Sequence, residues 1–308
     1  MTETSATETG VTEVSATGTR VTETGVTEVK WPVPEPDLPA ETSRVLAEAT
    51  RAAVTAFRAA RAGYSRAQLA EQVQMGADGT PTTRLDILVD TAVAEVVDRN
   101  KVNLISEEIG VIDHGSAVTL VVDPVDGTAN ATAGVPLASF AGVLAVDGVP
   151  TEALTCWLDT GRCWHAVVGQ PSRYRTSGRR ELDGAAVSLL RPHGTDDEAW
   201  WRITRRAARV RILSSSCLEA ALVAEGATDA FADAGSDTHR IMDLAAAMVT
   251  VPAAGGAVLD ARGRPLEIST DLSLRWSGVV AASRELAEAL AEEIVGKTPV
   301  GKAPKESP

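Results

Sequence analysis

An acidic loop directly after an apolar run is the feature that most constrains this chain. Residues 118–122 predict a buried strand of a parallel sheet. The loop that follows, residues 123–130, reads Asp-Pro-Val-Asp-Gly-Thr-Ala-Asn. Open α/β sheets bind ligands at the carboxyl ends of their strands, where paired carboxylates can hold Mg²⁺ and a Gly-Thr turn can hold phosphate. Ordinary turns also use Asp and Gly, so this loop alone leaves both interpretations open.

Three further segments place acidic residues where a strand or helix is predicted to begin or end. The apolar strand at 104–106 is followed by Glu107 and Glu108. A Gly/Pro/Thr-rich hairpin at 76–83 leads to Asp86 at the start of a helix. Asp243 stands at the start of an Ala-rich helix, where a carboxylate that stabilises the helix dipole is the alternative interpretation.

Taken together, these segments resemble the inositol monophosphatase superfamily, the lithium-sensitive, Mg²⁺-dependent sugar and nucleotide phosphatases. The sequences of these motifs are most similar to those of the archaeal-type branch, which combines inositol monophosphatase and fructose-1,6-bisphosphatase activities. The resemblance runs from residue 75 to about residue 290, and it implies an α/β (α+β) fold, a layered αβαβα sandwich. The segments that carry it are residues 75–82, 105–110, 123–130, 216–219, 240–243 and 253–258.

The chemistry of phosphate esters agrees with this resemblance. Their negative charge repels hydroxide, so hydrolysis needs cations, and Mg²⁺ prefers oxygen ligands to His or Cys. The resemblance implies two or three Mg²⁺ ions. Glu107, Asp123 and the Val125 carbonyl would hold the first ion, Asp123 would bridge to the second, and Asp126 and Asp243 would complete the second site.

The resemblance also assigns the catalytic and phosphate-binding groups. Thr128 and Asp86 would orient and deprotonate the attacking water, with Glu107 beside them. The backbone N–H groups of Gly127 and Thr128 would hold phosphate oxygens at the start of a short helix.

Five positions match substrate contacts of the family: Asp126, Ser214, Ser215, Asp233 and Arg240. Four of these five matches leave an alternative open. Asp233 could be a turn residue at the end of a strand, and the serines could be a polar connection between a strand and a helix. Arg240 could reach a second phosphate or a polyol, or it could pair with an acidic residue at the surface.

Composition excludes several other classes of protein. A net charge of −13 over 308 residues argues against nucleic-acid and anionic-membrane partners. Three cysteines without metal-ligand spacing, no membrane-spanning apolar run and no signal-peptide core predict a cytoplasmic protein with reduced thiols. The expected partner is a small phosphorylated substrate, and the resemblance also implies a homodimer.

The N-terminal segment contains a repeat, because residues 7–14 recur unchanged as residues 22–29. Its Thr/Glu-rich composition predicts disorder through about residue 30, followed by a Pro-rich linker that ends at residue 39. We expect a phosphatase domain at 40–295, with a metal-binding part at 40–180 and an α/β part at 181–295, and a flexible tail at 296–308. The elements expected within it are helices at 40–62, 85–98, 218–225, 244–253 and 283–295 and strands at 139–146, 153–158, 163–168, 210–213 and 230–232.

These observations predict a Mg²⁺-dependent phosphoric monoester hydrolase acting on a small sugar or polyol phosphate, of the inositol monophosphate or fructose 1,6-bisphosphate type. Three alternatives remain. The substrate could be a nucleotide or nucleoside phosphate, including 3′-phosphoadenosine 5′-phosphate, or an intermediate of specialised biosynthesis. The chain could also be a catalytically silent binding relative, although it retains every expected type of metal ligand.

Overall fold

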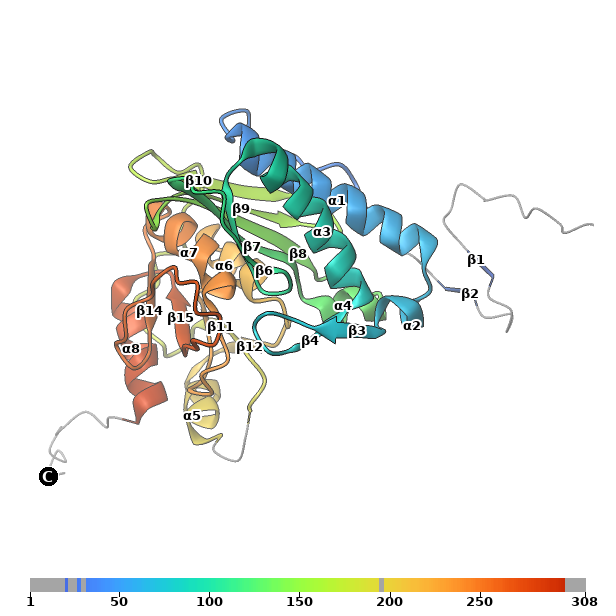
Figure 1. The fold of residues 1–308 in the computed structure, drawn as a ribbon. Helices are drawn as coiled ribbons and strands as arrows, with labels where there is room; N and C mark the ends of the chain where they lie inside the picture. Colours follow the sequence, from blue (N-terminus) through green and yellow to red (C-terminus); the bar gives the residue numbers. More distant parts are fainter. Residues whose placement is uncertain (1–19, 22–26, 29–31, 194–196, 297–308) are drawn as a thin grey trace, which may run out of the picture.

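Helices form three of the layers of this protein (Figure 1). The structure is a computed structural model, and it describes residues 20–21, 27–28, 32–193 and 197–296. The helices are α1 (Arg44–Gly63), α2 (Arg66–Leu69), α3 (Arg84–Asn100), α4 (Thr128–Ala133), α5 (Glu198–Arg206), α6 (Ser216–Ala224), α7 (Ile241–Ala253) and α8 (Arg284–Val295). Helices α1 and α3 cover one sheet, α6 and α7 lie between two sheets, and α5 and α8 cover the second sheet. The predicted αβαβα sandwich is confirmed. None of the described helices is both long and apolar enough to span a membrane.

The first sheet has six strands in the order β10-β9-β8-β7-β5-β6. Its strands are β5 (Asn103–Ser106), β6 (Gly110–Ile112), β7 (Val118–Asp126), β8 (Ser139–Val146), β9 (Val149–Trp157) and β10 (Cys163–Val167). The meander predicted at 139–168 is present as β8, β9 and β10. Strand β7 is parallel to β5, as predicted, but it is antiparallel to β8. It also continues beyond the predicted end at residue 122, with a register irregularity between Asp123 and Asp126, where Pro124 offers no N–H group.

The second sheet has five strands in the order β12-β11-β13-β15-β14. Its strands are β11 (Ala186–Leu189), β12 (Arg209–Arg211), β13 (Ala230–Ala232), β14 (Ala257–Asp260) and β15 (Gly278–Ala281). Strands β12, β11 and β13 are mutually parallel, so the segments after β12 and β13 leave the sheet at the same edge. Strands β11, β14 and β15 were not predicted from the sequence, because each is a four-residue run without a clear alternation of apolar and polar residues.

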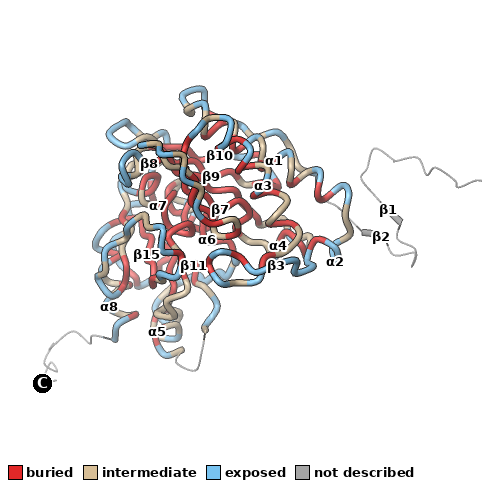
Figure 2. The backbone as a smooth tube through the Cα atoms, viewed as in Figure 1, coloured by how far each residue is buried: buried red, intermediate tan, exposed pale blue. Residues whose placement is uncertain are grey.

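Small residues allow the layers to approach closely, and the buried residues run through the centre of the sandwich (Figure 2). A Cβ atom added to Gly142 on β8 would lie 2.7 Å from Leu46 Cδ1 of α1. The helix therefore packs directly on the sheet at this point, and a larger residue on the strand would force the two apart.

The Pro-rich segment at 32–39 packs against the folded body, although it was predicted as a linker. The N–H group of Asp37 donates to Gly161 O at 2.7 Å, and Arg58 Nε of α1 donates to Val33 O at 2.9 Å. Arg58 also forms an ion pair with Glu35 at 2.7 Å. These contacts tie the segment to α1 and to the β9–β10 turn.

Most of the predicted terminal tails lies outside the described residues. Within residues 1–31 the structure describes only β1 (Arg20–Val21), which precedes the second copy of the repeat, and β2 (Thr27–Glu28), which lies in that copy; the two pair antiparallel. The disorder expected for the rest of residues 1–30, and the flexible tail expected at 296–308, therefore stay predictions. The same holds for the proposed division at residue 180.

A buried ion pair between α1 and the β9–β10 turn generates a stability prediction. Arg61 Nη1 lies 2.5 Å from Asp159 Oδ1, and both side chains are almost fully buried. Asp159→Ala should lower the free energy of unfolding by about 3 kcal/mol, because Arg61 loses its buried carboxylate partner. Urea unfolding measures this change. The double variant Arg61→Met/Asp159→Leu should recover most of the loss, and a loss below about 1 kcal/mol in the single variant would contradict this account.

Candidate active site

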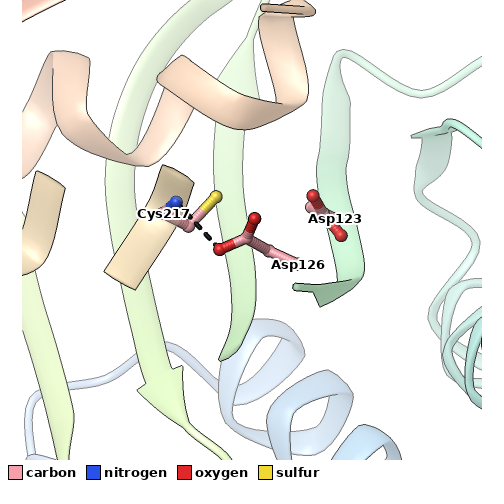
Figure 3. A group of neighbouring side chains, drawn as sticks. All are labelled: Asp123, Asp126 and Cys217. Carbon is pink, nitrogen blue, oxygen red and sulfur yellow. Dashed lines mark hydrogen bonds between the residues drawn. The ribbon is translucent and has the colours of Figure 1, made fainter. Parts of the chain in front are cut away.

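Two carboxylates at the end of β7 form the centre of the candidate site. Asp123 and Asp126 are 3% and 6% exposed, and one oxygen of each lies within 4.8 Å of the other and of Cys217 Sγ (Figure 3). The irregularity that Pro124 introduces in β7 is what separates the two side chains while keeping both at this strand end. Two carboxylates this close repel each other unless a cation lies near them.

Asp126 also caps helix α6. Its Oδ1 accepts the N–H group of Ser216 at 2.9 Å, and its Oδ2 accepts the N–H group of Cys217 at 2.9 Å (Figure 3). The hydroxyls of Ser215 and Ser139 donate to Oδ2 at 2.6 and 2.9 Å. This cap, which joins the first sheet to the central helices, was not foreseen, because nothing in the local sequence links residue 126 to residue 216.

Glu107 and Asp243 complete the cluster. In the parallel pairing of β5 with β7, Ser106 is opposite Val122, which places Glu107 next to Asp123. Asp243 lies in the first turn of α7 and accepts the N–H group of Arg240 at 2.6 Å. The structure therefore brings together four predicted metal-ligating carboxylates from three separate elements.

Arg240 is the cation that faces this cluster. Its guanidinium forms an ion pair with the buried Asp78 and lies 3.5 Å from Glu107 Oε2. Nη2 donates to Thr80 Oγ1 at 3.2 Å. A second arginine, Arg275, lies 3.6 Å from Asp78 Oδ2 and was not identified from the sequence. Arg240 thus pairs with an acidic residue, but this residue is the buried Asp78 and not an acid at the surface. Asp78 lies at the tip of the hairpin formed by β3 (Gln72–Met75) and β4 (Pro81–Thr83).

Asp86 and Thr128 form the predicted pair. Thr128 Oγ1 donates to Asp86 Oδ1 at 2.7 Å and lies 3.0 Å from the Val125 carbonyl oxygen. Asp86 Oδ2 accepts both the N–H group and the hydroxyl of Thr83, at 3.0 and 2.7 Å. Thr83 is the N-cap of α3, so the helix cap and the predicted Asp86–Thr128 pair share one carboxylate. The Thr-x-x-Asp spacing at 83–86 is a sequence signal from which this cap could have been predicted, although it was not used.

The turn after Asp126 requires glycine. Gly127 has φ +87°, and an added Cβ would lie 2.7 Å from Leu137 O. It is the N-cap residue of α4, whose first N–H groups have no partner within the helix. Asn130, also in this motif, donates through Nδ2 to Leu213 O at 2.7 Å and to Ser214 O at 3.2 Å. These hydrogen bonds join the two halves of the site, and they were not predicted from the sequence.

The predicted substrate contacts differ in their surroundings. Ser214 is exposed, with φ +58°, whereas Ser215 is buried and donates to Asp126. Asp233 is fully buried, and its carboxylate accepts the N–H groups of Ser236 and Thr238 at 2.8 Å each. The structure therefore gives Asp233 partners in its own loop and does not bring it to the cluster. A substrate role for these residues stays a prediction.

Burial makes the cluster hold protons in the absence of a cation. It raises the pKa of Asp126 to about 6, although hydrogen bonds from Ser215 and Ser139 lower it. It raises the pKa of Glu108, which accepts the Thr82 hydroxyl, to about 7. Burial also raises the pKa of Asp123, and the charges of the neighbouring carboxylates add to this effect.

The donors of this site fit Mg²⁺. Four carboxylates and the Val125 carbonyl supply oxygen atoms, which this ion prefers. Cys217 does not fit as a ligand, because burial raises the pKa of its thiol well above the ordinary value. Its Sγ instead lies 3.6 Å from the Asp243 carbonyl oxygen.

The raised pKa values generate a pH prediction. In a metal chelator, the free energy of unfolding should fall as the pH rises from about 5 to about 7.5. Asp126 and Glu108 have folded-state pKa values of about 6 and about 7, above their ordinary values of 3.8 and 4.5. Their stabilising contribution is complete below the ordinary pKa values, and it is lost as the pH rises through the folded-state values because the folded state binds more protons. Urea midpoints across this range test the prediction.

Saturating Mg²⁺ is the control for this measurement. A bound cation stabilises the ionised carboxylates, so it should flatten or reverse the slope. A midpoint that rises with pH in the chelator would contradict the proton uptake assigned to the cluster.

Comparison with known proteins agrees with this geometry. The model of the inositol monophosphatase family matches residues 41–298. A protein from Methanothermobacter thermautotrophicus named fructose-1,6-bisphosphatase/inositol-1-monophosphatase is 34% identical, over 73% of this chain and 87% of its own length. The bifunctional NADP phosphatase/NAD kinase of Methanococcus maripaludis is 29% identical over 73% of this chain, but the match covers 44% of that longer protein.

Solved structures show the same fold. A Pyrococcus horikoshii protein described as similar to inositol-1 monophosphatase has a TM-score of 0.64 and 26% identity, over 73% of this chain and 88% of its own. The extragenic suppressor protein of Bartonella henselae has a TM-score of 0.68 over 82% of this chain and 98% of its own, and at 22% identity it supports the fold alone. With the family model covering most of its length, this chain belongs to the inositol monophosphatase family and is a phosphoric monoester hydrolase.

Proposed function

We propose that this protein is a Mg²⁺-dependent phosphatase that hydrolyses a small sugar or polyol phosphate, of the inositol monophosphate or fructose 1,6-bisphosphate type. The observation that carries the proposal is the position of the Asp86–Thr128 pair beside the buried carboxylate cluster. The names of relatives such as the Methanothermobacter thermautotrophicus protein support this substrate class.

Two or three Mg²⁺ ions are proposed for the cluster. Glu107, Asp123 and the Val125 carbonyl would hold the first ion, and Asp123, Asp126 and Asp243 would hold the second. Asp126 Oδ1 accepts a single described hydrogen bond, from Ser216, and therefore retains a lone pair for a cation. Bound Mg²⁺ would offset the charge of the phosphate ester and lower the pKa of a coordinated water.

The protein's own groups then position the water and the phosphate. Because the Thr128 hydroxyl donates its hydrogen bond to Asp86 Oδ1, Thr128 Oγ1 can accept a hydrogen bond from water. As Thr128 takes up the proton of that water, its own proton passes to the Asp86 carboxylate, which is the final base. Thr83 holds the other oxygen of Asp86, which fixes the direction of the pair. The free N–H groups at Gly127 and Thr128 are proposed to hold the phosphate oxygens.

A second candidate function is removal of a phosphate from a nucleotide. It is favoured by the likeness to the NADP phosphatase/NAD kinase of Methanococcus maripaludis. The carboxylate cluster suits either substrate, because it contacts the phosphate and not the rest of the molecule. A homodimer in the cytoplasm remains part of the proposal, and the three free cysteines are consistent with a reducing compartment.

Phosphate release with and without Mg²⁺ is the experiment that tests the function. The panel contains inositol 1-phosphate, fructose 1,6-bisphosphate, NADP, 3′-phosphoadenosine 5′-phosphate and simple sugar and nucleoside monophosphates. Mg²⁺-dependent turnover of a sugar or polyol phosphate above the others supports the proposal. Preference for NADP or another nucleotide supports the second candidate. No turnover of any compound would overturn both.

Asp123→Asn should reduce turnover by at least about 10³-fold, because it weakens a ligand proposed for both ions. Isothermal titration should show a matching loss of Mg²⁺ affinity. Asp98→Asn is the control, since the Asp98 side chain is 58% exposed and pairs with His114. Near-normal activity of Asp123→Asn would refute the metal assignment.

Thr128→Ala should lower kcat by about 10²-fold, because Asp86 loses the hydroxyl through which it acts on water. Mg²⁺ affinity measured by titration should stay close to that of the unaltered protein. Thr128→Ser retains the hydroxyl and should keep most of the rate. If Thr128→Ser is as slow as Thr128→Ala, the hydroxyl is not the group that matters.

A further inference from the structure

A buried carboxyl group lies beneath the site and has no part in the proposed chemistry. Glu219 is on α6, is fully buried and belongs to the motif at 216–219. It does not belong to the cluster of Asp123, Asp126 and Cys217. A buried carboxyl group that neither binds metal nor pairs with a cation is costly, so its hydrogen bonds show what it does.

Glu219 binds the backbone of the segment that leads from β12 into α6. Its Oε1 accepts the N–H group of Leu213 at 3.1 Å, and its Oε2 accepts the N–H group of Ser215 at 3.4 Å. The residue between them, Ser214, has φ +58°, a conformation that a residue with a Cβ adopts only at an energetic cost. The two hydrogen bonds therefore hold a strained backbone in place.

The opposite side of the same segment is held by Asn130. Its Nδ2 donates to the carbonyl oxygens of Leu213 and Ser214, at 2.7 and 3.2 Å. Residues 213–215 are thus fixed through their N–H groups by Glu219 and through their carbonyls by Asn130, which follows the Gly127 turn. Between these clamps the Ser214 side chain is exposed, and the Ser215 hydroxyl reaches Asp126.

We propose that Glu219 is a positioning residue for the substrate: it fixes residues 213–215 so that Ser214 faces the substrate, whereas Asp126 is also held independently by Ser139 and by the first N–H groups of α6. This inference rests on the proposed function, because it assigns residues 213–215 to the substrate side of that site. Glu219 acts through these residues and does not touch the reacting atoms.

The state of the carboxyl group decides which variant is conservative. Burial raises the pKa of Glu219 to about 8, against the hydrogen bonds from the N–H groups of Leu213 and Ser215 that lower it. At neutral pH the side chain therefore carries a proton, and glutamine reproduces its shape and its acceptor for Leu213. Leucine has a similar volume and no acceptor. E219Q and E219L thus form a matched pair.

Steady-state kinetics with the best substrate of the panel tests the proposal. E219L should raise KM by about tenfold while kcat stays within about threefold, because the loss affects substrate placement and not the metal cluster. E219Q should keep KM within about threefold of the unaltered protein. Glu288→Leu, at an exposed position of α8, is the control for a leucine in place of a helical glutamate. Mg²⁺ affinity should be unchanged in all three.

Several kinetic results would overturn the proposal. One is an unchanged KM in E219L, and another is an equal rise of KM in E219Q and E219L. A fall in kcat that follows the fraction of folded protein, with KM constant, would show that Glu219 only stabilises the fold.

Amide hydrogen exchange on the unaltered protein gives an answer even if E219L does not fold. The amides of Leu213 and Ser215 should exchange at least about tenfold more slowly than that of the exposed Ser214 between them. Equal exchange of the three amides would overturn the proposal. This measurement needs no substrate, so it separates failure of the Glu219 role from failure of the proposed phosphatase activity.

Discussion

Burial of several carboxylates at one point is the constraint on which the rest of this structure depends. Asp123, Asp126, Glu107 and Asp243 converge where two sheets and the central helices meet, and ionised groups so placed repel one another. The fold offsets this repulsion with backbone N–H groups, serine hydroxyls and the guanidinium of Arg240. The charge that these donors leave uncompensated raises the pKa values of the cluster and could be offset by a bound metal ion.

Asp126 shows how binding chemistry and architecture share the same atoms. Its carboxylate accepts hydrogen bonds from the first N–H groups of α6. A substitution of Asp126 would therefore change both the proposed cation site and the N-terminus of a central helix. Asp86 also has two roles, since it caps α3 and orients Thr128. The candidate site is therefore a junction between layers of the sandwich and not a set of side chains placed on a finished scaffold.

The sequence predicted what depends on local pattern. The acidic loop at 123–130, the hairpin before Asp86 and the family resemblance together located the cluster and the layered fold. Contacts between distant segments could not be predicted from the sequence. Examples are the contacts of Asp126 with Ser216, Arg240 with Asp78, and Asn130 with Leu213. The strands β11, β14 and β15 were missed for a related reason, because short runs of small residues become strands through pairing with neighbours and not through their own periodicity.

The separation of the site residues along the chain has a consequence for folding. The Thr128–Asp86 hydrogen bond joins residues 42 positions apart, and the Ser215–Asp126 bond joins residues 89 apart. Contacts across such distances form only after a large loss of chain entropy, so they follow the local helices and hairpins. Asp126 thus gains its Ser215 and α6 partners only when the second half of the chain docks on the first, whereas Ser139 reaches it from the neighbouring strand β8. The complete site therefore forms only when the last layer of the sandwich packs. A partly folded chain contains the same acidic residues, but they are too far apart to act as a phosphatase site.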